Sequence, residues 1–168
     1  MIYLLDANVL IDANRDYYPI GRVDEFWEWL VYQGEQGTLK IPIDVYEEVK
    51  AGTDDLADWV KDAATEAAIK LDEEVNIDLV RKVTEEGYAP DLTDIEIQGV
   101  GRDPLFIAYA LKDPAGRTIV TTEVSKPSRV RAKRHVPDVC NDFGIQSINT
   151  YQLTRQLDFR TDWKKGIS

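Results

Sequence analysis

Four acidic residues occupy positions where an α/β fold would bring side chains together. Each follows a short apolar run or opens an expected helix: Asp6, Glu48, Asp103 and Glu123. Crossover helices of an open parallel sheet run opposite to the strands, so strand ends and helix starts share one edge. We therefore expect these four carboxylates to converge at that edge.

Converging carboxylates repel one another and lose hydration, so this set needs a compensating cation. The chain has one histidine, His135, and one cysteine, Cys140, which excludes zinc fingers and intrachain disulfides. Oxygen donors without His or Cys favour Mg²⁺ or Mn²⁺, which bind phosphate oxygens and activate water. The residues thus indicate phosphodiester hydrolysis with one ion, or with two that lie about 3.5–4 Å apart.

Each acid also has an ordinary structural explanation. Asp6 is then a turn residue after a strand, and Glu123 is a solvated loop acid. Asp103 precedes Pro104, which is a strong helix start, so it is explained as a plain N-cap. Capping and metal binding are compatible roles for one carboxylate.

Glu47 and Glu48 compete for one position in the acidic set. The spacing of Asp44 and Glu47 predicts a capping box, in which Glu47 bonds the backbone of Asp44. Glu48 borders the expected buried face beside Val49. We therefore assign Glu48 to the metal site.

Hydrophobic periodicity predicts strands that alternate with helices along the chain. Short apolar runs predict strands at residues 2–5, 38–41, 118–121 and 145–148. Amphipathic spacing and capping signals predict helices at residues 23–31, from 44, 56–63, 74–86, 104–111 with Asp103 as N-cap, 137–143 and 151–157. The alternation predicts an α/β fold with a mostly parallel sheet.

Length and composition predict one domain spanning residues 1–168, since 168 residues with 43% hydrophobic content suffice for one core. An acidic helical insertion is expected around residues 65–100, with a loop from Gly87 to Gly101. The N-terminal run shows neither an export signal nor a membrane span. The single cysteine suits a reducing, cytoplasmic setting.

Charge is unevenly distributed along the chain. Twenty Lys and Arg against 31 Asp and Glu give a net charge of −11, which disfavours non-specific binding to nucleic acid. Residues 1–100 carry 8 basic and 24 acidic groups, whereas residues 101–168 carry 12 and 7. A polyanionic partner is therefore expected to meet the C-terminal part.

Four segments resemble the motifs of PIN-domain nucleases, in the same order. LLDANVLI resembles the first motif, in which an acid, a small residue and Asn follow an apolar strand. IPIDVYEEV resembles the second motif, RDPLFIAYAL the third and IVTTE the fourth. The resemblance covers about residues 1–150, apart from the acidic segment before Asp103, and implies a three-layer fold with helices flanking a mostly parallel central sheet.

Matched by position, the resemblance assigns roles to individual residues. Asp6, Glu48 and Asp103 match the metal-binding acids. Asn8 and Thr121 match the polar residues that help to order that site. Glu123 matches the fourth acid, where the family usually has Asp.

The resemblance also implies an activity and partners. Many single-domain PIN proteins are ribonuclease toxins of toxin–antitoxin pairs. The implied function is therefore an endoribonuclease that depends on Mg²⁺ or Mn²⁺ and hydrolyses RNA. The implied partners are an RNA substrate, a small antitoxin protein and a second copy in a homodimer. These expectations rest on analogy with the family.

A basic stretch follows the fourth motif and contains five cations without an acid among them: Lys126, Arg129, Arg131, Lys133 and Arg134. Such a run is often a solvated surface loop. Two functional interpretations remain open beside that one. The stretch guides the RNA backbone towards the ions, or it docks an acidic antitoxin segment over the same entrance.

Three other classes of protein compete with the nuclease as interpretations of the sequence. A phosphatase of the haloacid dehalogenase type needs Asp-x-Asp after the first strand, whereas this chain has Asn8 at the third position. A nucleotide-binding domain needs a glycine-rich phosphate loop, and the chain has none. A catalytically degenerate PIN-fold protein that serves as a binding or scaffold module is the remaining alternative, and Glu123 in place of Asp supports it.

Overall fold

The computed structural model describes residues 1–167 and contains one five-stranded sheet, in which every neighbouring pair is parallel. The strands are β1 (Ile2–Leu5), β2 (Leu39–Pro42), β3 (Lys70–Leu71), β4 (Arg117–Val120) and β5 (Gln146–Ile148). Their order across the sheet is β3-β2-β1-β4-β5. The chain therefore extends the sheet first on one side of β1 and then on the other, which makes the β1–β4 boundary a topological switch point.

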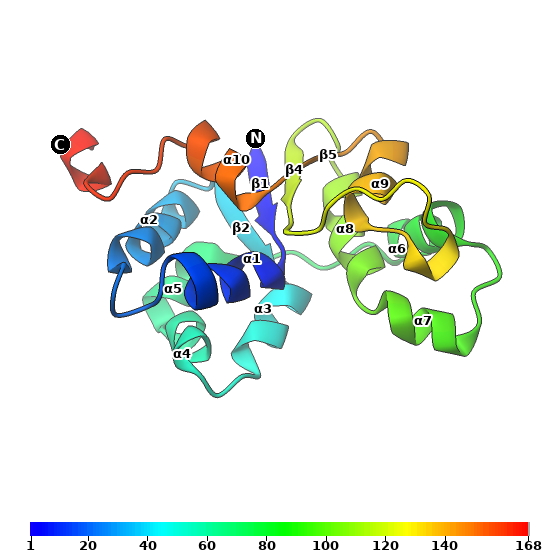
Figure 1. Cartoon of the computed structure of the whole chain (residues 1–168), viewed down its shortest axis with the longest axis horizontal. Coiled ribbons are helices and arrows are strands. Elements are labelled where there is room, and N and C mark those ends of the chain that lie inside the picture. The colour runs from blue at the N-terminus through cyan, green and yellow to red at the C-terminus, as the bar shows by residue number, and fades with distance from the viewer. Residues whose placement is uncertain (168) are drawn as a thin grey trace.

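Helices cover both faces of the sheet. The first helical layer contains α1 (Ala7–Asp12), α2 (Asp24–Glu35), α3 (Ile43–Lys50), α4 (Asp55–Lys61) and α5 (Ala63–Ile69). The second contains α6 (Ile77–Lys82), α7 (Asp94–Val100), α8 (Asp103–Leu111) and α9 (Val136–Asp142). Figure 1 shows the two layers on opposite sides of the strands, with α10 (Thr150–Gln156) beside β1. The predicted α/β class, three layers and mostly parallel sheet are confirmed.

The position of the strands in the core explains why their sequences are apolar at consecutive positions. Leu4 and Leu5 of β1 are fully buried, and so are Ile119 and Val120 of β4. A parallel strand covered by helices on both faces must be apolar at consecutive positions rather than at alternate ones. The central strands thus form a rigid base whose carboxyl ends carry the polar residues.

The predicted capping box at the start of α3 is not formed. Helix α3 begins one residue earlier than Asp44, and Pro42 at its N-cap gives no side-chain hydrogen bond. The Asp44 carboxylate instead accepts a hydrogen bond of 3.1 Å from the Tyr109 hydroxyl. Because Asp44 lies inside the first turn, its side chain packs towards α8 rather than back onto the helix start.

Helix α8 also begins one residue earlier than predicted. Its N-cap is Arg102 and not Asp103, which lies in the first helical turn. Gly101 adopts a positive φ of 59° just before it, a backbone conformation that glycine accepts without strain. The turn at Gly101 therefore sets the helix start, and Asp103 is not used as a cap.

The segment at residues 65–100 contains more regular structure than its sequence suggests. It includes the edge strand β3, a π-helical turn at Val83–Tyr88 and helix α7, where a loop was expected. Thr93 caps α7 by accepting a hydrogen bond of 3.2 Å from the amide of Glu96. Glu73, just after β3, forms hydrogen bonds of 3.0 and 2.8 Å with the buried Arg117 guanidinium. This ion pair fixes the edge of the acidic segment to β4.

None of the helices within residues 1–167 has the length and apolar character that a membrane-spanning helix requires.

Candidate active site

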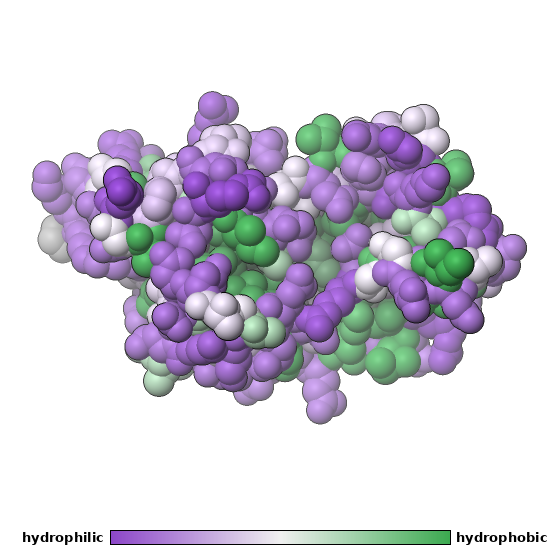
Figure 2. Space-filling model, turned by 60° about the horizontal axis from the view of Figure 1, so that its bottom comes forward, coloured by the Kyte–Doolittle hydropathy of each residue, from purple (hydrophilic) through white to green (hydrophobic). Residues whose placement is uncertain are grey.

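The four predicted acids line one cavity at the carboxyl ends of β1 and β4. Its volume is about 460 Å³, and its wall contains Asp6, Asn8, Glu48, Arg102, Asp103 and Glu123. Figure 2 brings this edge of the molecule forward and shows a hollow between the two helical layers, bordered mainly by hydrophilic residues. The topology thus brings together residues that are up to 117 positions apart in the sequence.

Asp6 is held directly at the switch point. Its amide donates to the Val120 carbonyl at 3.0 Å, which extends the pairing of β1 with β4 by one residue. Its carboxylate Oδ2 accepts a hydrogen bond of 3.1 Å from the Thr121 hydroxyl. The Thr121 oxygen in turn accepts a hydrogen bond of 3.2 Å from the amide of Glu123. Thr121 therefore holds the Asp6 carboxylate and the Glu123 backbone in place.

Burial changes the acidity of the two aspartates. Loss of hydration raises the pKa of Asp6 from 3.8 to about 6, against the opposing effect of the Thr121 hydrogen bond. The same cause raises the pKa of Asp103 to about 7, and the charges of Glu123, Asp6 and Glu48 add to it. Near neutral pH these two groups thus lie close to their protonation midpoints, where a bound cation would strongly favour the charged forms.

Glu48 occupies the rim of the cavity. Its side chain is 51% exposed, so it borders solvent rather than the buried face of α3. The guanidinium of Arg102 approaches its Oε2 at 4.0 Å and also donates a hydrogen bond of 2.6 Å to the Asp44 carbonyl. Glu47 is exposed as well, but it is not among the residues that line the cavity. Of these two glutamates, Glu48 is therefore the one that lies in the cavity wall.

Glu123 is already engaged by the start of α9. Its Oε2 accepts a hydrogen bond of 2.8 Å from the Val136 amide, and His135 Nδ1 lies 3.9 Å away. The same His135 nitrogen lies 2.7 Å from the Val124 carbonyl. Glu123 thus ties the segment after β4 to α9, a structural role that the sequence analysis did not foresee.

Asn8 lies exposed on the cavity wall, in the first turn of α1. Within residues 1–167 its side chain forms no hydrogen bond, so it is free to contact a ligand.

The donor set fits a hard cation in its chemistry. Within residues 1–167, no three Asp, Glu, His or Cys side chains form a ready-made cluster for an ion as they stand. The cavity nevertheless offers carboxylate oxygens without sulfur or imidazole donors, and Arg102 is the one cation in its wall. Loss of hydration first, and neighbouring carboxylates second, raise the pKa values of the half-buried Asp6 and Asp103, and bound Mg²⁺ or Mn²⁺ would offset both effects.

The basic stretch divides into paired and unpaired cations. Arg131 binds Asp91 at 2.8 Å and Glu96 at 3.0 Å, and Arg134 binds Asp142 at 2.8 Å. Three exposed cations form no ion pair with any of the described residues: Lys126, Arg129 and Lys133. The first group fixes the loop to α7 and α9, and the second is available to a partner.

Sequence reasoning missed two residues near the acids. Arg102 could have been noticed because it precedes Asp103 directly. Tyr88 is buried, and its hydroxyl has no hydrogen-bond partner among residues 1–167. Burial and the nearby charges of Asp103 and Glu123 raise the pKa of Tyr88. Nothing in its sequence context marked it, because the segment around it lacks a clear pattern.

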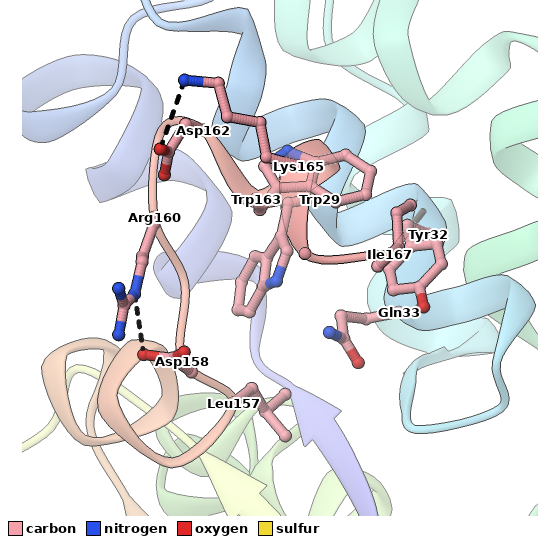
Figure 3. A pocket seen from close by; sticks show the side chains of 11 residues that line it. Trp29, Tyr32, Gln33, Leu157, Asp158, Arg160, Asp162, Trp163, Lys165 and Ile167 are labelled. Carbon is pink, nitrogen blue, oxygen red and sulfur yellow. Dashed lines mark hydrogen bonds and ion pairs between the residues drawn. The ribbon is translucent and has the colours of Figure 1, made fainter.

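A second cavity lies between α2 and the C-terminal segment and contains none of the four acids. Its volume is about 570 Å³, and Figure 3 shows Trp29, Tyr32 and Trp163 in its wall. Trp163 packs against Tyr32 with ring centres 5.0 Å apart and donates a hydrogen bond of 3.0 Å to the Glu25 carbonyl. These contacts hold the C-terminal segment on α2.

The fold and the cavity define the chain as a parallel α/β protein with an acidic site at its switch point. Residues 3–161 match the family described as "Domain of unknown function (DUF4411)", and the chain belongs to that family. No curated protein and no solved structure matches the chain.

Proposed function

We propose that the protein is a PIN-like endoribonuclease that depends on Mg²⁺ or Mn²⁺. The observation that carries this proposal is the convergence of Asp6, Glu48, Asp103 and Glu123 on one cavity. Asp6 and Asp103 are half-buried and form no ion pair with any residue of 1–167, an arrangement that costs stability unless a ligand compensates it. The order of the four motifs along the chain adds the family analogy.

The chain's own residues would divide the work as follows. Asp6 and Asp103 would hold the ion from the floor of the cavity, and Glu48 would complete its ligands from the rim. Thr121 fixes the orientation of Asp6 through its 3.1 Å hydrogen bond. Glu123 acts directly or through water. When bound, the ion would supply a Lewis acid for the phosphate and an activated water.

The biological setting follows from the same analogy and belongs to the proposal. The protein would act in the cytoplasm as the toxin of a toxin–antitoxin pair, as a homodimer, with a small antitoxin protein as its inhibitor. The unpaired cations Lys126, Arg129 and Lys133 would approach the RNA backbone or an acidic antitoxin segment.

A second candidate is a degenerate PIN-fold protein that binds without cleaving. Two observations favour it: Glu123 already holds the Val136 amide, and the carboxylates of residues 1–167 form no ready-made ion cluster. Both candidates share one fold and one cavity. They differ in whether the cavity binds a divalent ion and turns over RNA.

A titration with Mn²⁺ separates the two candidates. An intact site stabilises the folded state by mass action, by about 2.7 kcal/mol when the ion is at 100 times its dissociation constant. We expect a rise in melting temperature with Mn²⁺, its loss in Asp6→Asn, and Mn²⁺-dependent cleavage of single-stranded RNA. Thermal stabilisation without cleavage of any RNA would favour the binding protein, and the absence of both would contradict the nuclease.

A further inference from the structure

A third cavity adjoins the acidic one and has a different character. Its volume is about 520 Å³, and Glu123 belongs to the walls of both cavities. Thr121, which bonds Asp6, lies in its wall together with Thr122 and residues 147–152. A ligand in this cavity would therefore sit directly beside the group that binds the proposed ion.

Two exposed tyrosines from distant parts of the chain flank this cavity. Tyr17 ends the π-helical turn after α1, and Tyr151 lies in the first turn of α10. Their ring centres are 5.5 Å apart, with the planes inclined at 68°. Tyr17 is 45% exposed and Tyr151 is 52% exposed. The pair thus presents aromatic surface to solvent next to the proposed site.

The neighbouring residue Tyr18 shows that this exposure is not a general property of the segment. Tyr18 stacks on Phe26 with ring centres 4.4 Å apart and also contacts Phe159. Tyr18 therefore anchors the segment to the core. Tyr17, one position earlier, lines the cavity, and its ring contacts Tyr18 and Tyr151 with ring centres 6.5 and 5.5 Å away.

The charges in the wall favour a neutral ligand over an anionic one. Its charged residues are Asp12 and Glu123, and it contains neither Lys nor Arg. A phosphate would be repelled from this cavity, whereas a nucleobase is uncharged and flat. The wall also contains Ser125, and the unpaired Lys126 follows it directly in the chain. Lys126 could therefore bind the phosphate of a nucleotide whose base lies in the cavity.

Polar groups in the wall are available to the edge of a base. The hydroxyls of Thr122 and Ser147 form no hydrogen bond within the described residues. In contrast, the side chains of Asn149 and Gln152 bond each other's backbone amides in a capping box, each at 2.9 Å. Base discrimination would therefore be weak, and stacking would provide most of the affinity.

We infer that Tyr17 and Tyr151 form a subsite that stacks one unpaired nucleobase of the substrate strand. This inference rests on the proposed ribonuclease function and names a part of its substrate site. A base inside a duplex cannot enter such a cavity without being unstacked, so the subsite selects single-stranded RNA. The phosphate next to that base would then lie towards Lys126 and, once an ion is bound, would face the acidic cavity.

The test compares two oligomers of equal charge: an eight-residue oligouridylate and its abasic counterpart, both measured by fluorescence anisotropy in EDTA. We expect the wild-type protein to bind the oligouridylate about tenfold more tightly, which is one stacked base at the low end of the usual range. Tyr17→Ala combined with Tyr151→Ala should abolish this preference and leave binding of the abasic oligomer unchanged.

Tyr17→Phe combined with Tyr151→Phe is the matched control, because it keeps both rings and removes only the hydroxyls. It should retain the preference. Tyr151→Ala alone serves if the double variant does not fold, since Tyr151 is an exposed helix residue, and it should reduce the preference about threefold or more.

Equal binding of both oligomers by the wild-type protein would overturn the subsite, and so would an unchanged preference in the alanine variants. Cleavage with Mn²⁺ is measured separately on the wild-type protein. A base preference without any cleavage would refute the nuclease and leave the stacking subsite in place.

Discussion

The four acids of the cavity fall into two pairs with different surroundings. Asp6 and Asp103 lie at its floor, where burial raises their pKa values to about 6 and about 7. Glu48 is half exposed at the rim, Glu123 is less exposed, and each of this second pair, called the rim pair below, has another partner: Arg102 near Glu48 and the Val136 amide at Glu123. The floor pair thus carries unbalanced charge, and the rim pair is partly compensated by the protein itself.

This difference separates residues that cost stability from residues that contribute to it. A half-buried carboxylate without a cation weakens the folded state at neutral pH, because folding removes part of its hydration. A carboxylate that bonds a helix start supports the fold and need not serve a ligand. Removing each kind of charge should therefore have opposite effects on stability.

The largest expected effect concerns the floor pair. Asp6→Asn or Asp103→Asn should lower kcat/KM for single-stranded RNA about 1000-fold, or about 4 kcal/mol, because the ion loses a charged ligand. Cleavage of a labelled oligonucleotide with Mn²⁺ measures this change. Full activity in either variant would show that this aspartate is not a ligand of the ion. The floor pair and the rim pair would then not differ in function.

The stability of the metal-free protein should depend on pH in the direction set by the floor pair. The raised pKa of Asp6 means that the folded state binds its proton more tightly than the unfolded state does. The stability that this proton contributes to the folded state is complete below about pH 4 and is lost as pH rises through about 6. Asp103 extends this loss to about pH 7.

In urea titrations with EDTA, the free energy of unfolding of Asp6→Asn should therefore exceed that of the wild-type protein by about 3 kcal/mol at pH 8. The two free energies should be equal at pH 4. The Asn oxygen still accepts from Thr121, which keeps the variant a fair comparison. A strong loss of stability at pH 8 would instead show that Asp6 is needed as a charged structural acceptor.

A smaller effect is expected at the rim. Glu48→Gln should lower kcat/KM about tenfold, or about 1.4 kcal/mol, because Glu48 is half exposed and compensated by Arg102. Glu47→Gln is the matched control on the same helix and should leave cleavage and stability unchanged, since no capping box forms. If Glu47→Gln is the inactive variant, the assignment on α3 is reversed.

The smallest effect is expected for substitutions in the basic stretch, which also contains residues with and without a partner in the protein. Replacing Lys126, Arg129 and Lys133 by Ala should reduce the salt dependence of RNA binding by roughly 0.7 per lost phosphate contact. Arg131→Ala should leave that slope unchanged, because Arg131 already binds Asp91 and Glu96. Equal slopes for the triple variant and the wild-type protein would assign these cations to a protein partner or to solvation.

The positions of the acids could be predicted because they depend on the most regular parts of the chain. The apolar runs of β1 and β4 mark buried parallel strands, and parallel topology alone brings Asp6 and Glu123 to one edge. Glu48 and Asp103 followed from the predicted starts of α3 and α8, although the N-cap lies two residues earlier than predicted in α3 and one residue earlier in α8.

The remaining details depend on contacts between distant segments, which local patterns do not encode. Asp44 satisfied the spacing of a capping box, but the Tyr109 hydroxyl from α8 binds its carboxylate instead. The two-residue strand β3 is too short to show periodicity, and it is placed by pairing with β2. The ion pairs of Arg131 likewise join segments 40 and 35 residues apart.

The strand order has a consequence for how the site is assembled. Strands β1 to β3 with their helices are continuous in the chain and carry Asp6 and Glu48, whereas the later half carries Asp103 and Glu123. Across the sheet, the halves meet at the single pairing of β1 with β4. A break within the connection at residues 72–76 would therefore yield two fragments with half of the acids each, and only their complementation would restore the cavity.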